Sequence, residues 1–376
     1  TGSTEDSKFY ASFGDQRATG IVLDDTYERN TFRVNASKKI GKVELGVNAS
    51  YFTDKTDVVG DQIGDQNRPL YWFVLNTPAN IPLSSYKDWD NPESYAYADN
   101  YYNAYYQNPY WAIGTNRDMD ETNRIVGNLN LSWDIVEWLN FTGRASINNA
   151  WGNGTNWRAE QEYDKDLQPQ HKKVNSFVEE TTFERKSYNF DALFTGNFKF
   201  ADAFTLKAIL GGTNQTAFNL RTGMRADNLS IPDFYDLSNG TGGLSPVLND
   251  GTAYVDQYER INYGLFGDFT LGYNNYLFLN LSGRQDWTST LDKNNRSYFY
   301  PAVGLSFVAT DAFEVLKSGD ILTFAKVTVS NATVYNDLNP YGISETYSQA
   351  EGFPYGGING FYIDPVAVDS EIKKEK

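Results

Sequence analysis

The sequence predicts an all-β protein, part of a transmembrane antiparallel β-barrel with long extracellular loops and short periplasmic turns. Apolar and polar residues alternate over segments of about ten residues or more, whereas soluble strands average about 5–6. Aromatic residues form 16% of the chain and stand near the segment ends, where membrane-interface girdles lie. Mean hydropathy is −0.55, and no segment approaches the about 20 consecutive apolar residues that a membrane-spanning helix needs.

The alternation gives each predicted strand two faces. In Ile125–Trp133 the apolar residues share one face and asparagine and serine share the other, and Leu277–Arg284 repeats this pattern. Charges on the polar face suit a watery lumen and would be costly in the dry core of a sandwich. The residues expected to face the lumen are Asn130, Arg144, Asp268 and Arg284. Those expected to face lipid are Leu129, Leu131, Leu279, Leu281, Val303 and Leu305.

The connections between the segments support a barrel. About eleven strands are expected, at residues 7–14, 30–38, 43–53, 120–133, 138–149, 182–200, 204–217, 258–273, 276–287, 296–309 and 322–332. Short joints alternate with longer ones, as in outer-membrane barrels. The long extracellular loops are expected at 54–119, 150–181, 218–257 and 333–376. Single-chain bacterial barrels have an even number of strands, so residues 1–376 are expected to be a partial barrel domain.

Composition and charge exclude several classes of function. The chain has 376 residues, no cysteine and a net charge of −16. Disulfides and thiolate chemistry are therefore excluded, and a nucleic-acid partner, which needs clustered Lys and Arg, is not expected. The chain opens on Thr1-Gly2-Ser3 without a basic and apolar leader and ends on a charged run, so we expect a fragment of a longer exported protein.

Catalytic signals are weak. The one histidine, His171, stands in a polar loop, and no nucleophile-elbow motif or paired metal-binding histidines occur. Asp118–Glu121 offers oxygen ligands to a hard cation, but a solvated loop end is the favoured interpretation. We expect no enzyme, no metal and no cofactor. Because an unpaired charge near low-dielectric walls is costly, Arg284 is expected to pair with a carboxylate, with Asp268 as the candidate.

The loop at 54–119 is unusually rich in Tyr and Trp. Aromatic faces stack on sugar rings and Tyr adds a hydroxyl, but such side chains also pack on one another and contact partner proteins. Self-packing or partner contact is favoured over direct ligand contact. We expect an ordered outer domain with a small core around Trp72, Trp89 and Trp111. The candidates for ligand or partner contact are Trp72, Trp89, Tyr101, Tyr105 and Trp111.

Several stretches, in matching order and spacing along most of the chain, carry a family resemblance. They are Gly2–Gly14, Gly20–Val22, Tyr27–Asn35, Tyr263–Gly267, Tyr273–Leu277, Ser282–Ser289, Asn294–Arg296 and Tyr300–Phe307. They resemble the barrel domain of the SusC-like (RagA-like) TonB-dependent outer-membrane transporters of Bacteroidetes. Lys326–Thr333 departs from the family pattern, and the family's TonB box, plug and last strands have no counterpart in this sequence.

The resemblance implies a share of a barrel of about 22 strands in the outer membrane of a Gram-negative cell. It implies TonB-dependent import of a nutrient oligomer, glycan or peptide. The expected partners are a SusD-like surface lipoprotein, TonB acting through the plug, the oligosaccharide or peptide ligand, and outer-membrane lipid. Three alternatives stay open: a passive porin, a surface assembly or secretion platform built on such a barrel, and a soluble β-sandwich lectin. The sequence does not name the substrate.

Overall fold

The computed structural model describes residues 1–376 apart from 65, 99, 103–105, 163–172, 250–251, 254, 318–321, 344–346, 351–357, 359, 364–368, 370 and 374–376. Eleven long strands form one antiparallel sheet, in which each pairs with the next long strand along the chain. They are β2 (Ser7–Thr19), β3 (Thr26–Ile40), β4 (Val43–Val59), β5 (Asn116–Val136), β6 (Leu139–Arg158), β7 (Phe177–Phe200), β8 (Phe204–Asp227), β12 (Val255–Tyr273), β13 (Leu277–Thr288), β14 (Ser297–Val308) and β15 (Lys326–Ala332). Each alternating segment overlaps one of these strands, and the all-β antiparallel class is confirmed.

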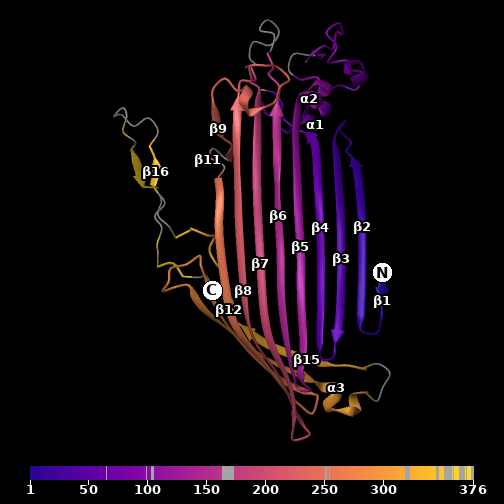
Figure 1. Cartoon of the computed structure of the whole chain (residues 1–376), viewed down its shortest axis with the longest axis vertical. Coiled ribbons are helices and arrows are strands. Elements are labelled where there is room, and N and C mark those ends of the chain that lie inside the picture. The colour runs from indigo at the N-terminus through magenta and orange to yellow at the C-terminus, as the bar shows by residue number, and fades with distance from the viewer. Residues whose placement is uncertain are drawn as a thin grey trace.

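The remaining elements of the described chain are short. The short strands are β1 (Gly2–Ser3), β9 (Leu244–Pro246), β10 (Leu248–Asn249), β11 (Thr252–Ala253), β16 (Tyr347–Gln349) and β17 (Phe361–Ile363). The helical elements are α1 (Leu70–Leu75), α2 (Pro109–Thr115), α3 (Ala309–Ala312) and the 3-10 turns η1 (Leu83–Tyr86), η2 (Leu237–Asn239) and η3 (Glu314–Lys317). Figure 1 shows α1 and α2 at one end of the strands, here called the outer end, and α3 at the other. Within the described ranges, no helix is both long and apolar enough to cross a membrane.

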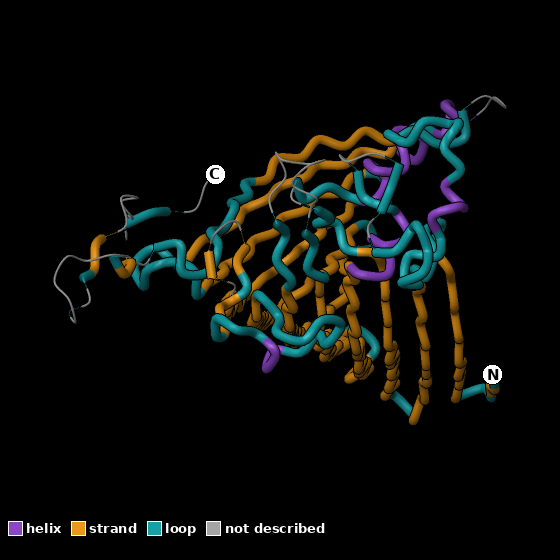
Figure 2. Tube along the Cα trace, turned by 90° about the horizontal axis from the view of Figure 1, so that it is seen from above, coloured by secondary structure: helices purple, strands orange, loops and turns teal. Residues whose placement is uncertain are grey.

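The sheet is curved and open. Its pairing runs from β1 through β15 in one line, and in the described part of the chain this line does not return on itself. Figure 1 shows β2 to β8 side by side, and Figure 2 shows from above that the strands follow a curved wall. Strand twist and tilt produce this curvature when a sheet forms part of a barrel. The fold is therefore an open section of a barrel wall.

The register places the apolar residues of neighbouring strands on one face. Leu281 lies opposite Phe269 on one side and Val303 on the other, and Leu131 lies opposite Leu45. Residues directly opposite each other across strands share a face. The face that carries the six leucine and valine positions expected to contact lipid is exposed in this open sheet, with Leu129 at 48% and Leu305 at 49%. Asn130, Arg144, Asp268 and Arg284 lie on the other, polar face.

The expected pairing of Arg284 with Asp268 is wrong. Arg284 Nε lies 2.6 Å from Asp286 Oδ1, and Asp268 instead accepts hydrogen bonds from the Asn280 amide at 3.2 and 3.0 Å. The register explains this, because Arg284 stands opposite Phe266, two positions along β12 from Asp268. A carboxylate two residues along the same strand lies on the same face and is closer.

The strands extend further at the outer end than the alternation predicts. β4 continues to Val59 and β5 begins at Asn116, so the predicted loop 54–119 gives up residues at both ends to the sheet. In this region the ladder pairs polar residues with polar residues, such as Lys55 with Glu121. Backbone hydrogen bonds need no alternation, and the pattern disappears where both faces meet water.

The apolar face is expected to contact lipid and the polar face a lumen. Spin labels at Leu281 and at Ser282 of the full-length protein in a bilayer should report opposite surroundings, because successive residues of a strand point to opposite faces. We expect the label at Leu281 to be relaxed mainly by oxygen and the label at Ser282 mainly by a water-soluble metal chelate. Equal accessibility at the two positions would contradict this assignment of the faces.

Candidate functional site

In its described residues, the connection between β4 and β5 forms a small domain at the outer end of the sheet. Helix α2 begins at Pro109, where the missing N–H costs nothing, and the Asn108 side chain accepts a hydrogen bond from the Tyr110 backbone N–H at 3.1 Å. Gly60 N–H donates to the Asn116 carbonyl at 3.0 Å, which joins the two feet of the loop. Backbone pairing at the end of the sheet therefore holds the two ends of the loop together.

The domain has its own hydrophobic core. The buried members are Ile63, Leu70, Phe73, Trp111, Ala112 and Ile113, and the partly buried residues packed against them are Val22, Val59, Trp89, Tyr106 and Ala159. Two of the three tryptophans expected at its centre, Trp111 and Trp89, belong to this packing. Val22 and Ala159 come from neighbouring connections, so the core also joins the loop to the rest of the outer end.

The other three candidate residues have different positions. Trp72 was expected in the core but is 36% exposed, with the Arg68 guanidinium 4.8 Å from its ring centre. Tyr101 is buried, and its hydroxyl lies 2.6 Å from the Thr77 hydroxyl. Burial raises the pKa of Tyr101. Tyr105 lies outside the described residues.

A glycine makes room for Trp89. A Cβ at Gly114 would stand 2.1 Å from Trp89 Cζ2, so the indole lies directly on the backbone of α2. Any side chain at this position has to displace the indole, because the approach is closer than real Cβ contacts allow. The glycine therefore sets the position of one aromatic wall of the site described next.

A cleft of about 710 Å³ lies between three connections at the outer end. These are the β4–β5 domain, the segment between β6 and β7, and the segment between β8 and β12. The aromatic side chains that line it are Trp89, Tyr97, Trp111 and Tyr235. The carboxylates that line it are Asp90, Glu160, Glu162 and Asp233. Its size is in the range of ligand-binding clefts, and its lining combines flat apolar faces with hydrogen-bond acceptors.

The wall formed by residues 231–235 is held from behind by Asn239. Its side-chain oxygen accepts from the Ile231 N–H at 3.0 Å, and its amide donates to the carbonyls of Ile231 at 2.8 Å and Phe234 at 2.6 Å. On this wall the Tyr235 ring stacks on Trp157 with 3.8 Å between ring centres. Burial and the neighbouring Asp233 carboxylate raise the pKa of Tyr235, so it stays a neutral hydroxyl.

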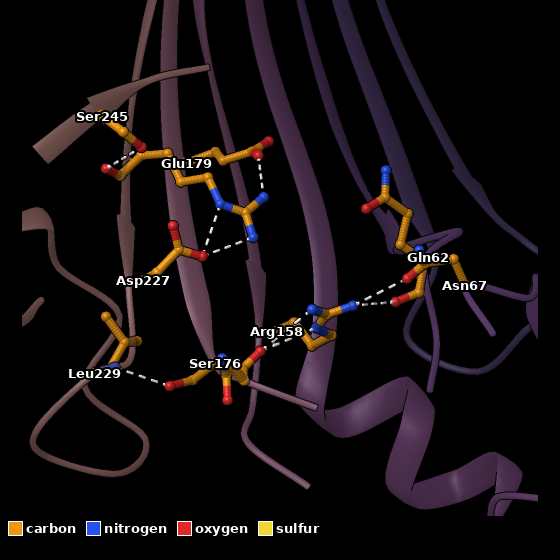
Figure 3. Close-up of polar contacts among 10 residues, drawn as sticks. Gln62, Asn67, Arg158, Ser176, Glu179, Asp227, Leu229 and Ser245 are labelled. Atoms are coloured by element: carbon orange, nitrogen blue, oxygen red, sulfur yellow. Dashed lines mark hydrogen bonds and ion pairs between the residues drawn. The ribbon is translucent and has the colours of Figure 1, made fainter. Parts of the chain in front are cut away.

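Two arginines anchor the loops beneath the cleft. Phe177, only 2% exposed, lies between the guanidinium groups of Arg158, 4.8 Å from its ring centre, and Arg225, 3.9 Å away. Arg158 also donates to the carbonyls of Asn175 and Gln62, which belong to different connections. Figure 3 shows the contact with Gln62. Arg225 pairs with a Glu179 carboxylate oxygen at 2.6 Å. Stacking and charge-assisted hydrogen bonds thus hold together the connections that form the cleft.

Asp118, at the outer start of β5, has a raised pKa of about 6. Burial is the largest cause, and the charges of Asp120, Asp61 and Glu179 add to it, while Arg221 opposes it. The folded state therefore holds the proton of Asp118 more tightly than the unfolded chain does. Stability of the outer end should fall as the pH rises from about 4 to about 6 and stay reduced above that range.

Asp118→Asn should remove this effect. We expect the variant to stabilise the outer end by about 1–2 kcal/mol at pH 7.5, since a shift of about two units is worth at most about 3 kcal/mol and solvent screens part of it. At pH 4 the gain should vanish. Amide hydrogen exchange of β5 at both pH values measures this, with Glu121→Gln as control, because Glu121 is a half-buried carboxylate of the same strand. A gain that does not depend on pH would rule out titration of Asp118 as its cause.

Sequence reasoning found one side of this site and missed the others. Trp89 and Trp111 were expected at the barrel mouth, but Glu160, Asp233 and Tyr235 lie on connections that showed no aromatic excess. The sequence signal for Asp233 and Tyr235 was Ile231-Pro232-Asp233-Phe234-Tyr235, an apolar and aromatic run inside a polar loop, and Glu160 had no such signal. Arg144, Asp268 and Arg284 do not reach the cleft, since none of them lines it. Among the residues that the structure covers, no group of three side chains is arranged to hold a metal ion.

The fold is similar to solved transporter structures. A chain of the RagAB peptide transporter superposes with a TM-score of 0.72 at 16% identity, over 99% of this chain and 40% of that chain. The RagAB peptide importer gives 0.71 at 16% identity in its closed-closed state and 0.72 at 18% in its open-open state, the latter over 97% of this chain and 38% of that one. No protein-family model matches the sequence, and no curated protein matches it significantly. The chain thus spans about two fifths of the length of the structures it resembles.

Proposed function

We propose that this chain is part of the barrel wall of a TonB-dependent, SusC-like importer that carries a nutrient oligomer, a glycan or a peptide, across the outer membrane. The single observation that supports this most is the superposition of 99% of the chain on a peptide transporter with a TM-score of 0.72. The resemblance of the sequence motifs to the same family supports it independently. A similar fold alone does not establish a function. The two faces of the sheet and the outer end provide further support.

The two faces of the sheet suit this function. The exposed apolar face fits a lipid environment, and the polar face fits a lumen for a hydrated cargo. On the polar face Arg144 lies 3.8 Å from Asp191, and Arg284 is paired with Asp286. Paired charges on this face give a hydrophilic wall without a strong field of one sign, which suits passage rather than tight binding.

The outer end suits recognition by a partner. On α1 the side chains of Tyr71 and Leu75 are 62% and 76% exposed, next to the half-exposed Trp72. Exposed aromatic and aliphatic side chains in a row are typical of protein interfaces. We propose that this face of α1 contacts a SusD-like surface lipoprotein, and that energy reaches the barrel from TonB through a plug domain.

Two alternative functions can each be distinguished from a TonB-dependent importer by one observation. A passive porin would take up its cargo in cells that lack TonB. A surface assembly or secretion platform would be recovered with secretion proteins rather than with a SusD-like lipoprotein. The cleft among the outer loops favours an importer over a platform, because a platform needs no ligand site.

The test uses the full-length transporter in its own cells. Uptake of fluorescent peptides and of fluorescent oligosaccharides is measured with TonB present and after TonB is deleted. We expect one of the two cargo classes to enter only when TonB is present, and a lipoprotein to copurify with the tagged transporter. Uptake that persists without TonB would refute the proposal, as would a transporter that carries neither cargo class.

A further inference from the structure

The cleft among the outer loops has a single sign of charge. Four carboxylates from all three connections line it, and no Lys, Arg or His lies among the lining residues that the structure describes. Asp90 has no ion-pair partner within the described ranges. Asp233 accepts a neutral hydrogen bond from the Tyr235 hydroxyl at 3.3 Å. Facing carboxylates at a partly enclosed site concentrate negative potential there, which attracts cations.

The chain itself shows how an ammonium group sits at the rim of this cleft. Lys173 Nζ lies 2.7 Å from a Glu160 carboxylate oxygen and 3.1 Å from one of Glu162. Hydrogen bonds to the two carboxylates raise the pKa of Lys173. All three side chains are exposed, so this contact is weak and another cation can replace it. The four carboxylates of the cleft together with the Lys173 ammonium group therefore have a net charge of about −3.

The aromatic side chains of the cleft also favour a cationic ligand. Trp89 is fixed against Gly114, and Tyr235 is fixed against Trp157, so their positions are set before a ligand arrives. Tyr97 is 48% exposed at the same cleft. Ammonium and guanidinium groups bind over such rings, and the aliphatic parts of Lys and Arg pack on them as well. A neutral sugar would use the rings and gain nothing from the charge.

We infer that this cleft binds the Lys or Arg side chains of a basic peptide and so selects cationic cargo at the entrance of the barrel. This inference rests on the proposed function, because it names the class of cargo that the proposed importer carries. The carboxylates of Asp90 and Asp233 hold the cationic head group, and the rings of Trp89 and Tyr235 contact its stem.

Binding to the purified full-length transporter in detergent tests the inference without uptake. The probes are three synthetic nine-residue peptides of one sequence with two lysines, two glutamines or two glutamates at the same positions. The variant is Asp90→Asn/Asp233→Asn, which keeps the size of both side chains. Asparagine also tolerates the left-handed backbone of position 233, where φ is 58°. The matched control is Glu93→Gln, a carboxylate on the same loop that does not line the cleft.

We expect calorimetry to show the lysine peptide binding at least about tenfold more tightly than the glutamate peptide, with the difference shrinking at high salt. The double variant should bind the lysine peptide about tenfold more weakly, and Glu93→Gln should not change it. Equal affinity for the three peptides would overturn the inference, and so would an unchanged affinity of the double variant. Uptake that is TonB-dependent but indifferent to charge would leave the proposed function standing and remove only this inference.

Discussion

Arg117→Met should cost the outer end about 3 kcal/mol, the lower end of the range for a buried ion pair, because the Asp57 side chain is 44% exposed. Arg117 is 7% exposed, and its guanidinium donates to Asp57 Oδ1 at 2.9 Å, to Asp25 Oδ1 at 3.3 Å and to the Asp24 carbonyl at 2.8 Å. Methionine fills a similar volume and leaves two carboxylates side by side without their cation. The connection between β2 and β3 then loses the Arg117 contacts that tie it to β4 and β5.

Amide hydrogen exchange of residues 20–25 and of the outer ends of β4 and β5 measures this cost locally. Arg17→Met is the matched control, because the Arg17 side chain is 73% exposed and pairs with Asp15 at the surface. We expect the control to change protection by less than about 0.5 kcal/mol. If the two variants have the same protection, the three contacts of Arg117 contribute nothing to the outer end.

Removal of the β4–β5 domain should abolish specific uptake while the barrel still inserts. The variant replaces residues 61–115 with a three-residue Gly-Ser-Gly joint between Gly60 and Asn116. Those two residues already share a hydrogen bond, so the strands can turn there, and the cost of closing a hairpin grows slowly with loop length. The deletion takes away Trp89, Trp111 and Asp90 together, and with them one complete wall of the cleft. We expect uptake to fall at least about tenfold.

The control keeps the domain and changes only its exposed face, in the variant Tyr71→Ser/Leu75→Ser. It should fold normally and keep the affinity for free peptide, because neither residue lines the cleft. A drop in lipoprotein copurification with unchanged peptide binding would separate partner contact from ligand contact. A deletion variant that inserts normally and takes up cargo at the wild-type rate would show that the domain has no part in transport.

The strands and their faces were predictable because the signal is local. A residue and its second neighbour along a strand share a face, so a sheet with one apolar face and one polar face leaves a period of two in the sequence itself. Leu129 and Leu131 on one face and Asn130 between them on the other are enough to assign that strand. The spacing between the alternating segments also predicted that short connections alternate with long ones. The helices α1 and α2 lie in one of the long connections.

The contacts between particular side chains were not predictable in this way. The sequence put Trp72, Trp89 and Trp111 in one class, but only the last two pack in the core, because α1 presents Trp72 to its outer side. Asp268 was the expected partner of Arg284, and the register placed Phe266 opposite instead. A shift of two residues along a strand changes no periodicity, yet it decides which charges meet.

By itself the sequence determined the all-β class, the strands, their two faces and the loop in which aromatic side chains gather, since each of these follows from the order of neighbouring residues. Only the tertiary structure decided the cleft and its charge. Asp90, Glu160 and Asp233 come from three connections that the strands carry to the same end of the sheet. Arg158 joins two of these connections, and Arg117 ties the β2–β3 connection to β4 and β5. Such proximity depends on strand order and register over long separations, and no local pattern records it.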